Sequence, residues 1–105
     1  MNDCLFCKIV NGEIPSEFIF ENDDCVAFKD IHPKASTHIL IVPKKHISSI
    51  ADVSYEDAPL LGKLLNYARE IGEKLSLSGY RLSINVGKDG GQEIFHLHIH
   101  LMSNS

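Results

Sequence analysis

Residues 94–101 read Ile-Phe-His-Leu-His-Ile-His-Leu, and this strict alternation constrains the fold more than any other feature of the sequence. Successive side chains of a β-strand point to opposite faces, so the pattern predicts a strand with one apolar, buried face. A register slip of one residue would bury the other face, so the pattern also fixes the pairing of the strand. The two faces would carry Phe95, Leu97, Ile99 and Leu101 on one side and His96, His98 and His100 on the other.

The remaining segments predict one α+β domain, residues 1–105, with a mainly antiparallel sheet. A short helix is expected from about Cys4 to Asn11, with Asp3 as its N-cap. Leu61 to Leu75 repeat apolar residues at intervals of three and four, which predicts a long amphipathic helix capped by Asp57. The other strands are expected at residues 18–20, 25–28, 37–42 and 80–86.

Composition argues against two classes of partner. Fourteen acidic and ten basic residues give a net charge of −4, and the longest basic run is Lys44-Lys45, so we expect no nucleic-acid partner. No apolar stretch approaches the ~20 residues that span a bilayer, and Met1-Asn2-Asp3-Cys4 lacks the layout of a signal peptide. Three cysteines, an odd number, are typical of a reducing compartment. We therefore expect a cytoplasmic protein with no membrane partner.

The row of three histidines is open to three interpretations. It can be a solvated polar face, although other polar residues would serve that purpose equally well. It can bind metal, but a rise of ~3.3 Å per residue separates His96 from His100 by roughly 13 Å. Because Zn–N bonds are only ~2.0–2.1 Å long, one ion could reach neighbouring histidines but not all three. The third interpretation is nucleotidyl transfer, in which His98 is a nucleophile towards phosphorus and a protonated neighbour assists.

The loop before this strand suits phosphate chemistry. Residues 87–92 read Gly-Lys-Asp-Gly-Gly-Gln, whose backbone amides and Gln92 side chain could hold phosphate oxygens. A glycine-rich loop is more often a plain hairpin turn, but its position directly before the histidines adds weight to the catalytic interpretation.

The segment His-Leu-His-Ile-His-Leu resembles the His-φ-His-φ-His-φ motif of the histidine triad superfamily, where φ is a hydrophobic residue. Residues 28–31, 37–47 and 85–92 also resemble its Hint-like branch in order and spacing. The resemblance implies a five-stranded antiparallel sheet with one long and one short helix, assembled as a homodimer. It also implies a hydrolase of purine nucleoside 5′-phosphoramidates, such as AMP-lysine or AMP amide, that needs no organic cofactor.

Position by position, the resemblance implies that His98 is the nucleophile that becomes nucleotidylated. His96 and His100 flank it, and His38 supports them. Asp30 would bind the ribose hydroxyls, although an aspartate at a strand end is usually only a turn residue. The other implied contacts are the apolar walls around the base, Phe6, Ile9, Phe28 and Ile31, and three positions near the phosphate, Asn85, Gln92 and Glu93. The sequence departs from the family at Glu93, where many members have serine, and ends five residues after His100.

Cys4 and Cys7 are spaced i, i+3, so a helix would place both thiols on one face. Such a pair can be redox-active, half of a metal site or simply buried, and no βαβ pattern supports a redox enzyme. The family resemblance implies a structural zinc site of Cys4, Cys7, His46 and His96, and unmetallated cysteines are the alternative. We expect Cys25 to lie in the core and His32 to be exposed without a role.

Two other functions fit the same motif. One is a dinucleoside polyphosphate hydrolase of the Fhit-like branch, which shares the triad. The other is a non-catalytic module that binds nucleotides or proteins. A sugar-nucleotide transferase is disfavoured, because that branch has glutamine where this chain has His100.

Overall fold

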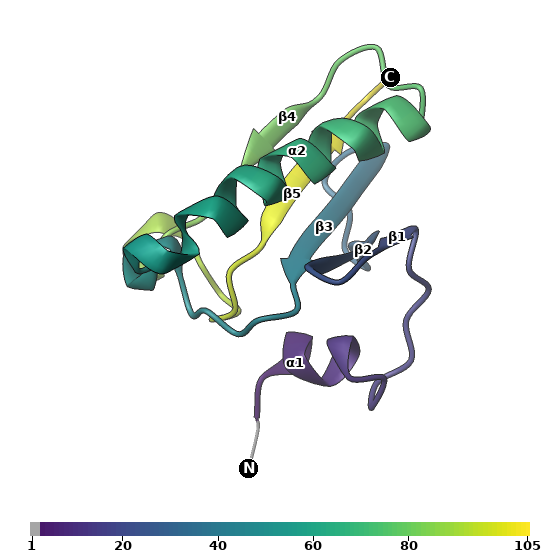
Figure 1. The fold of residues 1–105 in the computed structure, drawn as a ribbon. Helices are drawn as coiled ribbons and strands as arrows, with labels where there is room; N and C mark the ends of the chain where they lie inside the picture. The colour runs from purple at the N-terminus through teal and green to yellow at the C-terminus, as the bar shows by residue number, and fades with distance from the viewer. Residues whose placement is uncertain (1–2) are drawn as a thin grey trace.

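A computed structural model describes residues 3–105 of the chain and forms one five-stranded antiparallel sheet in the order β1-β2-β3-β5-β4. A long helix, α2, lies across one face of this sheet (Figure 1). The α+β class and the antiparallel sheet are therefore confirmed. The elements are α1 (Leu5–Val10), β1 (Phe20–Glu21), β2 (Cys25–Lys29), β3 (Thr37–Pro43), α2 (Ala58–Lys74), β4 (Arg81–Ser83) and β5 (Ile99–Ser103), with the 3₁₀ turns η1 (Ile50–Asp52), η2 (Tyr55–Asp57) and η3 (Lys88–Gly90).

The sheet separates two groups of buried apolar residues because β2 and β3 bury both of their faces. Ile39 and Ile41 of β3 point towards α2, whereas Leu40 and Val42 point to the opposite face. That second face is covered by α1, whose Phe6 and Ile9 pack there with Phe28. Central strands that are covered on both sides read as continuous apolar runs, as Ile39 to Val42 do here.

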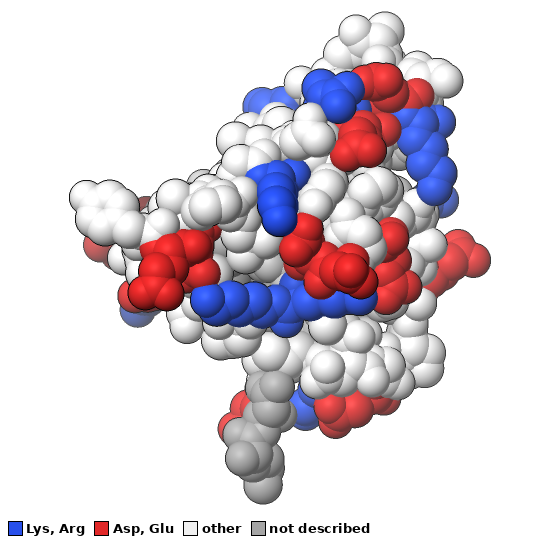
Figure 2. Space-filling view, viewed as in Figure 1, with Lys and Arg blue, Asp and Glu red and all other residues white. Residues whose placement is uncertain are grey.

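The long helix α2 forms as its periodicity predicts. Leu64, Ala68 and Ile71 are buried at intervals of four and three residues and face the sheet. Asp57 is its N-cap residue, but its side chain makes no capping bond and instead accepts from Lys45 at 2.6 Å. The outer surface of this side mixes positive and negative side chains (Figure 2), among them the pairs Lys63–Asp24 and Arg69–Glu73.

The strand predicted at residues 94–101 is displaced. β5 spans Ile99–Ser103 and pairs with β3 and β4, whereas residues 94–98 form no ladder. β3 runs to Pro43, which this register would set opposite Leu97, but the Leu97 amide donates instead to the oxygen of Ile47, beyond the end of β3. Phe95, predicted on the buried face, is consequently 47% exposed.

Three smaller predictions are also wrong in position. The N-cap of α1 is Cys4, whose Sγ accepts from the Cys7 amide, instead of Asp3. The first strand is Phe20–Glu21 instead of residues 18–20, and β4 spans only Arg81–Ser83 instead of residues 80–86. The chain leaves β4 early because it turns into η3 through Gly87 and Gly91, whose φ values of 73° and 87° favour glycine.

Within residues 3–105 no helix is long and apolar enough to cross a membrane. Residues 1 and 2 of the predicted single domain lie outside the described residues. The single-domain boundary and the homodimer remain predictions.

The core explains which isoleucines stabilise the fold. Ile41 is fully buried between β2 and β5, whereas Ile31 is 86% exposed. We expect Ile41→Ala to lower the free energy of unfolding by about 2–5 kcal/mol, because it leaves a cavity. The matched variant Ile31→Ala should change it by less than about 0.5 kcal/mol. Urea unfolding measures both, and equal losses would contradict this description of the core.

Candidate active site

The main cleft of the molecule has a volume of about 810 Å³ and lies on the side of the sheet that α1 partly covers. One end is apolar, and the other end holds three imidazoles. The apolar end is formed by Phe6, Ile9, Ile14, Phe28 and Leu40, and the polar end by His38, His98 and His100. His32 is exposed as predicted, but it also lines the cleft.

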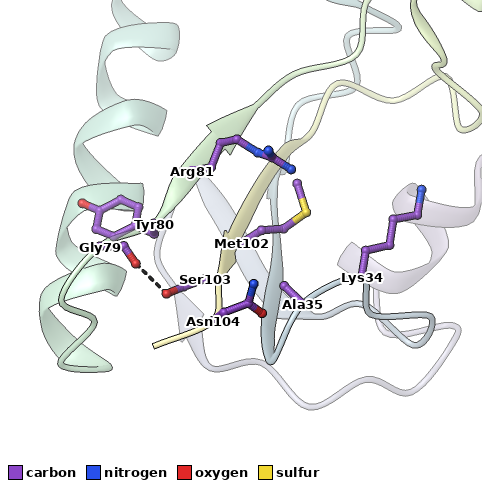
Figure 3. Close-up of a pocket in the computed structure, with 8 residues that line it drawn as sticks. All are labelled: Lys34, Ala35, Gly79, Tyr80, Arg81, Met102, Ser103 and Asn104. Atoms are coloured by element: carbon purple, nitrogen blue, oxygen red, sulfur yellow. Dashed lines mark hydrogen bonds between the residues drawn. The ribbon is translucent and has the colours of Figure 1, made fainter.

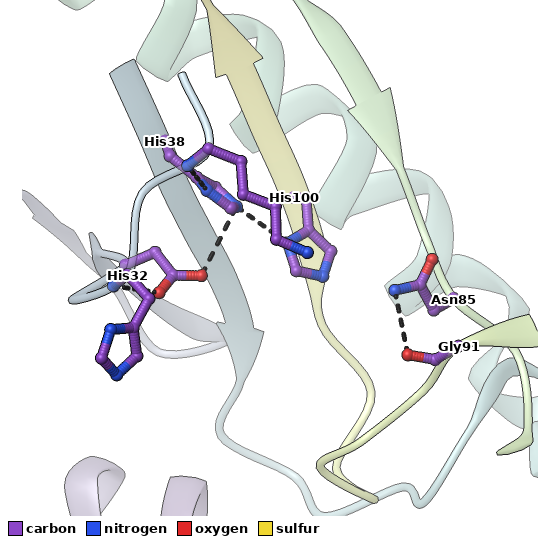
Figure 4. Close-up of polar contacts among 7 residues, drawn as sticks. His32, His38, Asn85, Gly91 and His100 are labelled. Carbon is purple, nitrogen blue, oxygen red and sulfur yellow. Dashed lines mark hydrogen bonds and ion pairs between the residues drawn. The ribbon is translucent and has the colours of Figure 1, made fainter. Parts of the chain in front are cut away.

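The register of β3 and β5 brings two of these imidazoles together. Leu40 lies opposite His100, and His38 lies opposite Met102, so His38 and His100 are diagonal neighbours on one face. Diagonal partners in an antiparallel pair are within reach of large side chains. The His38 Nε2 and His100 Nδ1 atoms are 2.9 Å apart (Figure 4).

The hydrogen bonds of His38 determine where the proton of His100 lies. The Lys34 amide donates to His38 Nδ1 at 3.1 Å, so the proton of a neutral His38 is on Nε2. From there it is donated to His100 Nδ1. A neutral His100 must then carry its own proton on Nε2, a buried atom with no hydrogen-bond partner among the described residues. His100 is therefore an unused hydrogen-bond donor inside the cleft.

In His98 the proton lies on the other ring nitrogen from the one that carries it in His100. Its Nδ1 lies 2.7 Å from the backbone oxygen of His96. A carbonyl can only accept, so Nδ1 carries the proton and Nε2 carries the lone pair. Phe6 packs edge-on against the ring, with centroids 5.0 Å apart and an interplanar angle of 89°. Lone pair and donor thus lie on adjacent rings, since the His98 and His100 centroids are 4.9 Å apart.

The electrostatics keep both rings neutral. Burial lowers the pKa of His98. Burial, followed by the nearby His98 and His38 rings, lowers the pKa of His100 to about 4. The protonated helper expected from the sequence is therefore not His100 in the free protein near neutral pH. Positive charge in the cleft comes instead from Lys29, Lys34 and Arg81.

The predicted apolar walls and the predicted ribose ligand do lie at the cleft. Phe6 and Phe28 are buried with their centroids 5.8 Å apart, and Ile9 lies beside them. Ile31 is not a core residue, since it is largely exposed at the rim. Asp30 lines the cleft, where its Oδ2 is 3.5 Å from His38 Nε2 and its Oδ1 accepts from the His32 amide.

The structure brings two of the three predicted phosphate residues to the cleft. Asn85 and Glu93 line it, and Asn85 Nδ2 donates to the Gly91 oxygen. Gln92 is buried and does not line the cleft. Its Oε1 accepts from Gly87, and its Nε2 donates to the oxygens of Ser48 and Ile94. Gln92 therefore holds the loop together.

His96 points away from the cleft, so the three histidines do not form one row. Its ring is fully buried, and its Nε2 lies 2.8 Å from the Pro43 oxygen. Its Nδ1 therefore carries the lone pair, and it is 3.2 Å from Cys4 Sγ, 3.5 Å from Cys7 Sγ and 3.2 Å from His46 Nδ1. The four predicted metal ligands have their ligand atoms within 4.8 Å of one another.

Several cleft residues had no role in the sequence analysis, among them Leu40, Arg81 and Met102. Met102 and Leu40 follow His100 and His38 at i+2, so the alternation of strand faces could have placed both. Arg81 lies beside Met102 in the β4–β5 register. The role of the Lys34 amide had no sequence signal, because it depends on a loop conformation.

Comparisons with known proteins agree with this fold. The family model described as "Scavenger mRNA decapping enzyme C-term binding" matches residues 3–105. The chain belongs to the histidine triad (HIT) family, and the findings support a HIT-family hydrolase. Protein HitA of Neisseria gonorrhoeae is 48% identical over 103 residues, which are 97% of this chain and 96% of that protein.

Two further relatives bear on function. The purine nucleoside phosphoramidase of Escherichia coli (strain K12) is 42% identical over 102 residues, which are 95% of this chain and 86% of that enzyme. The crystal structure of a HIT family hydrolase from Legionella pneumophila Philadelphia 1 has a TM-score of 0.93 at 48% identity, covering 98% of this chain and 94% of that one.

The proton positions can be measured directly. In long-range ¹H–¹⁵N spectra at neutral pH we expect His98 to be protonated on Nδ1 and His38 and His100 on Nε2. On acidification His100 should stay neutral until the pH approaches about 4, because its pKa is lowered by burial and its neighbours. A lone pair on His100 Nε2, or a charged His100 ring at pH 6, would contradict this assignment.

Proposed function

We propose that the protein hydrolyses purine nucleoside 5′-phosphoramidates of the AMP-lysine or AMP amide type through a nucleotidyl-His98 intermediate. One observation carries the proposal: the His98 Nε2 lone pair and the His100 Nε2 proton lie on adjacent rings at one end of a cleft whose other end is apolar. The name and the 42% identity of the Escherichia coli relative support the same substrate class.

The reaction takes two steps. The lone pair of His98 Nε2 attacks the α-phosphorus, the bond from phosphorus to the substrate nitrogen breaks, and the departing amine takes up a proton from solvent. Water then attacks phosphorus, the bond to His98 breaks, and a proton is released with the nucleotide. His100 Nε2–H donates a hydrogen bond to the departing nitrogen, and His38 holds the His100 ring in that orientation.

The apolar end of the cleft would hold the purine. Phe6, Ile9 and Phe28 offer a buried slot, and Ile31 would cover the base from the rim. Asp30 would accept hydrogen bonds from the ribose hydroxyls. Asn85 and Glu93 would lie near the phosphate, and Gln92 would act by holding the loop of residues 87–91 in place.

The nucleophile is tested by substitution. We expect His98→Ala to lower kcat/KM for AMP amide at least about 10³-fold, because the covalent step is lost. Tyr55→Ala is the control; Tyr55 is 98% exposed and does not line the cleft, so activity should be kept. Mass spectrometry of quenched turnover should find the nucleotidyl group on His98 alone. An adduct on another residue, or equal loss in both variants, would contradict the proposal.

The same panel tests the competing functions. Diadenosine polyphosphates hydrolysed faster than AMP amide would favour the Fhit-like activity. Nucleotide binding without turnover of either substrate would favour a non-catalytic module.

We also propose that Cys4, Cys7, His46 and His96 hold a structural zinc ion. The donor set fits: bonds of ~2.3 Å to sulfur and ~2.0–2.1 Å to nitrogen put tetrahedral ligand atoms about 3.3–3.8 Å apart. The S···N contacts measured here are 3.2, 3.3 and 3.5 Å. The Pro43 oxygen orients the His96 lone pair towards the thiols, as a neighbouring carbonyl does for many metal-bound histidines. A bound ion would tie α1 to the loop after β3.

Metal analysis tests the zinc site. We expect about one zinc per chain in the protein as isolated, and loss of it in Cys7→Ser, because a four-ligand site loses a thiolate. Cys25→Ala is the matched control, since Cys25 is buried in the α2-side core, away from the ligands. Zinc in Cys7→Ser at the wild-type level, or none in wild-type protein saturated with zinc, would contradict the proposal.

A further inference from the structure

A second, smaller hollow of about 270 Å³ adjoins the main cleft. Its lining includes Lys34, Arg81, Met102, Ser103 and Asn104, and we call it the basic hollow. Figure 3 shows Lys34 and Arg81 on two sides of Met102, reaching into the same space. No acidic residue lines the basic hollow, although the chain has fourteen acidic residues and a net charge of −4.

The basic hollow continues the cleft beyond the catalytic rings. Lys34, Arg81 and Met102 line both spaces. Met102 follows His100 at i+2 on the same face of β5, roughly 6.6 Å further along the strand. Whatever extends from a leaving group that is hydrogen-bonded to His100 Nε2 can therefore pass over Met102 into the basic hollow.

The two cations are available to a ligand. The side chains of Lys34 and Arg81 make no hydrogen bond or ion pair with residues 3–105. Other cations of residues 3–105 are engaged, as in Lys44–Glu21, Lys45–Asp57 and Lys63–Asp24, whereas Lys8, Lys29 and Lys88 likewise form no ion pair there. Asn104 adds a third donor: its Oδ1 accepts from Ser36, which leaves its Nδ2 free to point outwards. Lys34 also lies close enough to His100 to lower its pKa through charge repulsion.

We propose that the basic hollow binds an anionic group on the leaving group of the substrate, a carboxylate or a phosphate, through Lys34 and Arg81. This inference rests on the proposed function, because it needs a substrate whose phosphorus is attacked by His98 and whose leaving group is hydrogen-bonded to His100. Arginine and lysine are the residues that pair with carboxylate and phosphate. The selectivity of the enzyme among substrates would therefore depend on the charge of the leaving group, on the side of the phosphorus away from the nucleoside.

The experiment compares leaving groups that differ only in charge. AMP phosphoramidates of 4-aminobutyrate and 6-aminohexanoate are each set against the corresponding carboxamide, and diadenosine triphosphate supplies a phosphate leaving group. We expect a preference in kcat/KM of about tenfold for at least one carboxylate over its amide. Lys34→Met/Arg81→Met should remove most of this preference, so that the ratio of kcat/KM for carboxylate over carboxamide falls to near one, while Lys34→Met keeps the backbone amide that bonds His38. Lys63→Met is the matched control, because Lys63 lies on α2 and lines neither space.

The same ligands are then titrated calorimetrically into His98→Ala protein, with and without the two Met substitutions. This measures charge preference without turnover, so it separates the two proposals. If the wild-type protein shows no turnover but binds anionic ligands preferentially, and this preference depends on Lys34 and Arg81, the proposed hydrolase is rejected and the anion site is kept. No preference for any anionic ligand in either assay, or an equal loss for charged and neutral ligands in the double variant, would overturn the basic hollow as a leaving-group site. A preference for diadenosine triphosphate alone would assign it to phosphate.

Discussion

The hydrogen bond between His96 Nε2 and the Pro43 oxygen, 2.8 Å long and buried, is the contact on which both sites depend. It holds His96 where β3 ends, so that the ring faces Cys4, Cys7 and His46. The backbone oxygen of the same residue accepts from His98 Nδ1 and so directs the His98 lone pair into the cleft. His96 therefore contacts Cys4, Cys7 and His46 with its side chain and orients the proposed nucleophile, His98, with its main chain.

The two faces of the sheet differ in what they carry. The face beneath α2 carries the larger group of buried apolar residues, and burial of such side chains favours folding. The other face carries His38, His100 and Met102, which only stay in register because the neighbouring side chains on β3 and β5 are buried against α2. Reactive groups on a central strand pair are held more rigidly than groups on loops.

Much of this could be predicted from the sequence, because period-two and period-3.6 patterns report which faces are buried. α2 and β3 lie close to where their patterns place them. The displacement of segment 94–98 could not be predicted, since alternation does not say that the Leu97 amide bonds to Ile47 instead of to β3. The separation of His96 from His98 and His100 accompanies that displacement. The burial of Gln92 could not be predicted either, because its partners are backbone atoms of Gly87, Ser48 and Ile94, and these leave no pattern in the sequence.

Helix α1 has only six residues, which is too short to be stable alone in water. It carries Phe6 and Ile9 on one side and Cys7 near its start, and it reaches the rest of the molecule through these side chains. Its amides should therefore exchange with solvent through local opening, at a lower free energy than those of β3. The part of the cleft wall proposed to hold the base is thus expected to open separately from the imidazoles on the sheet.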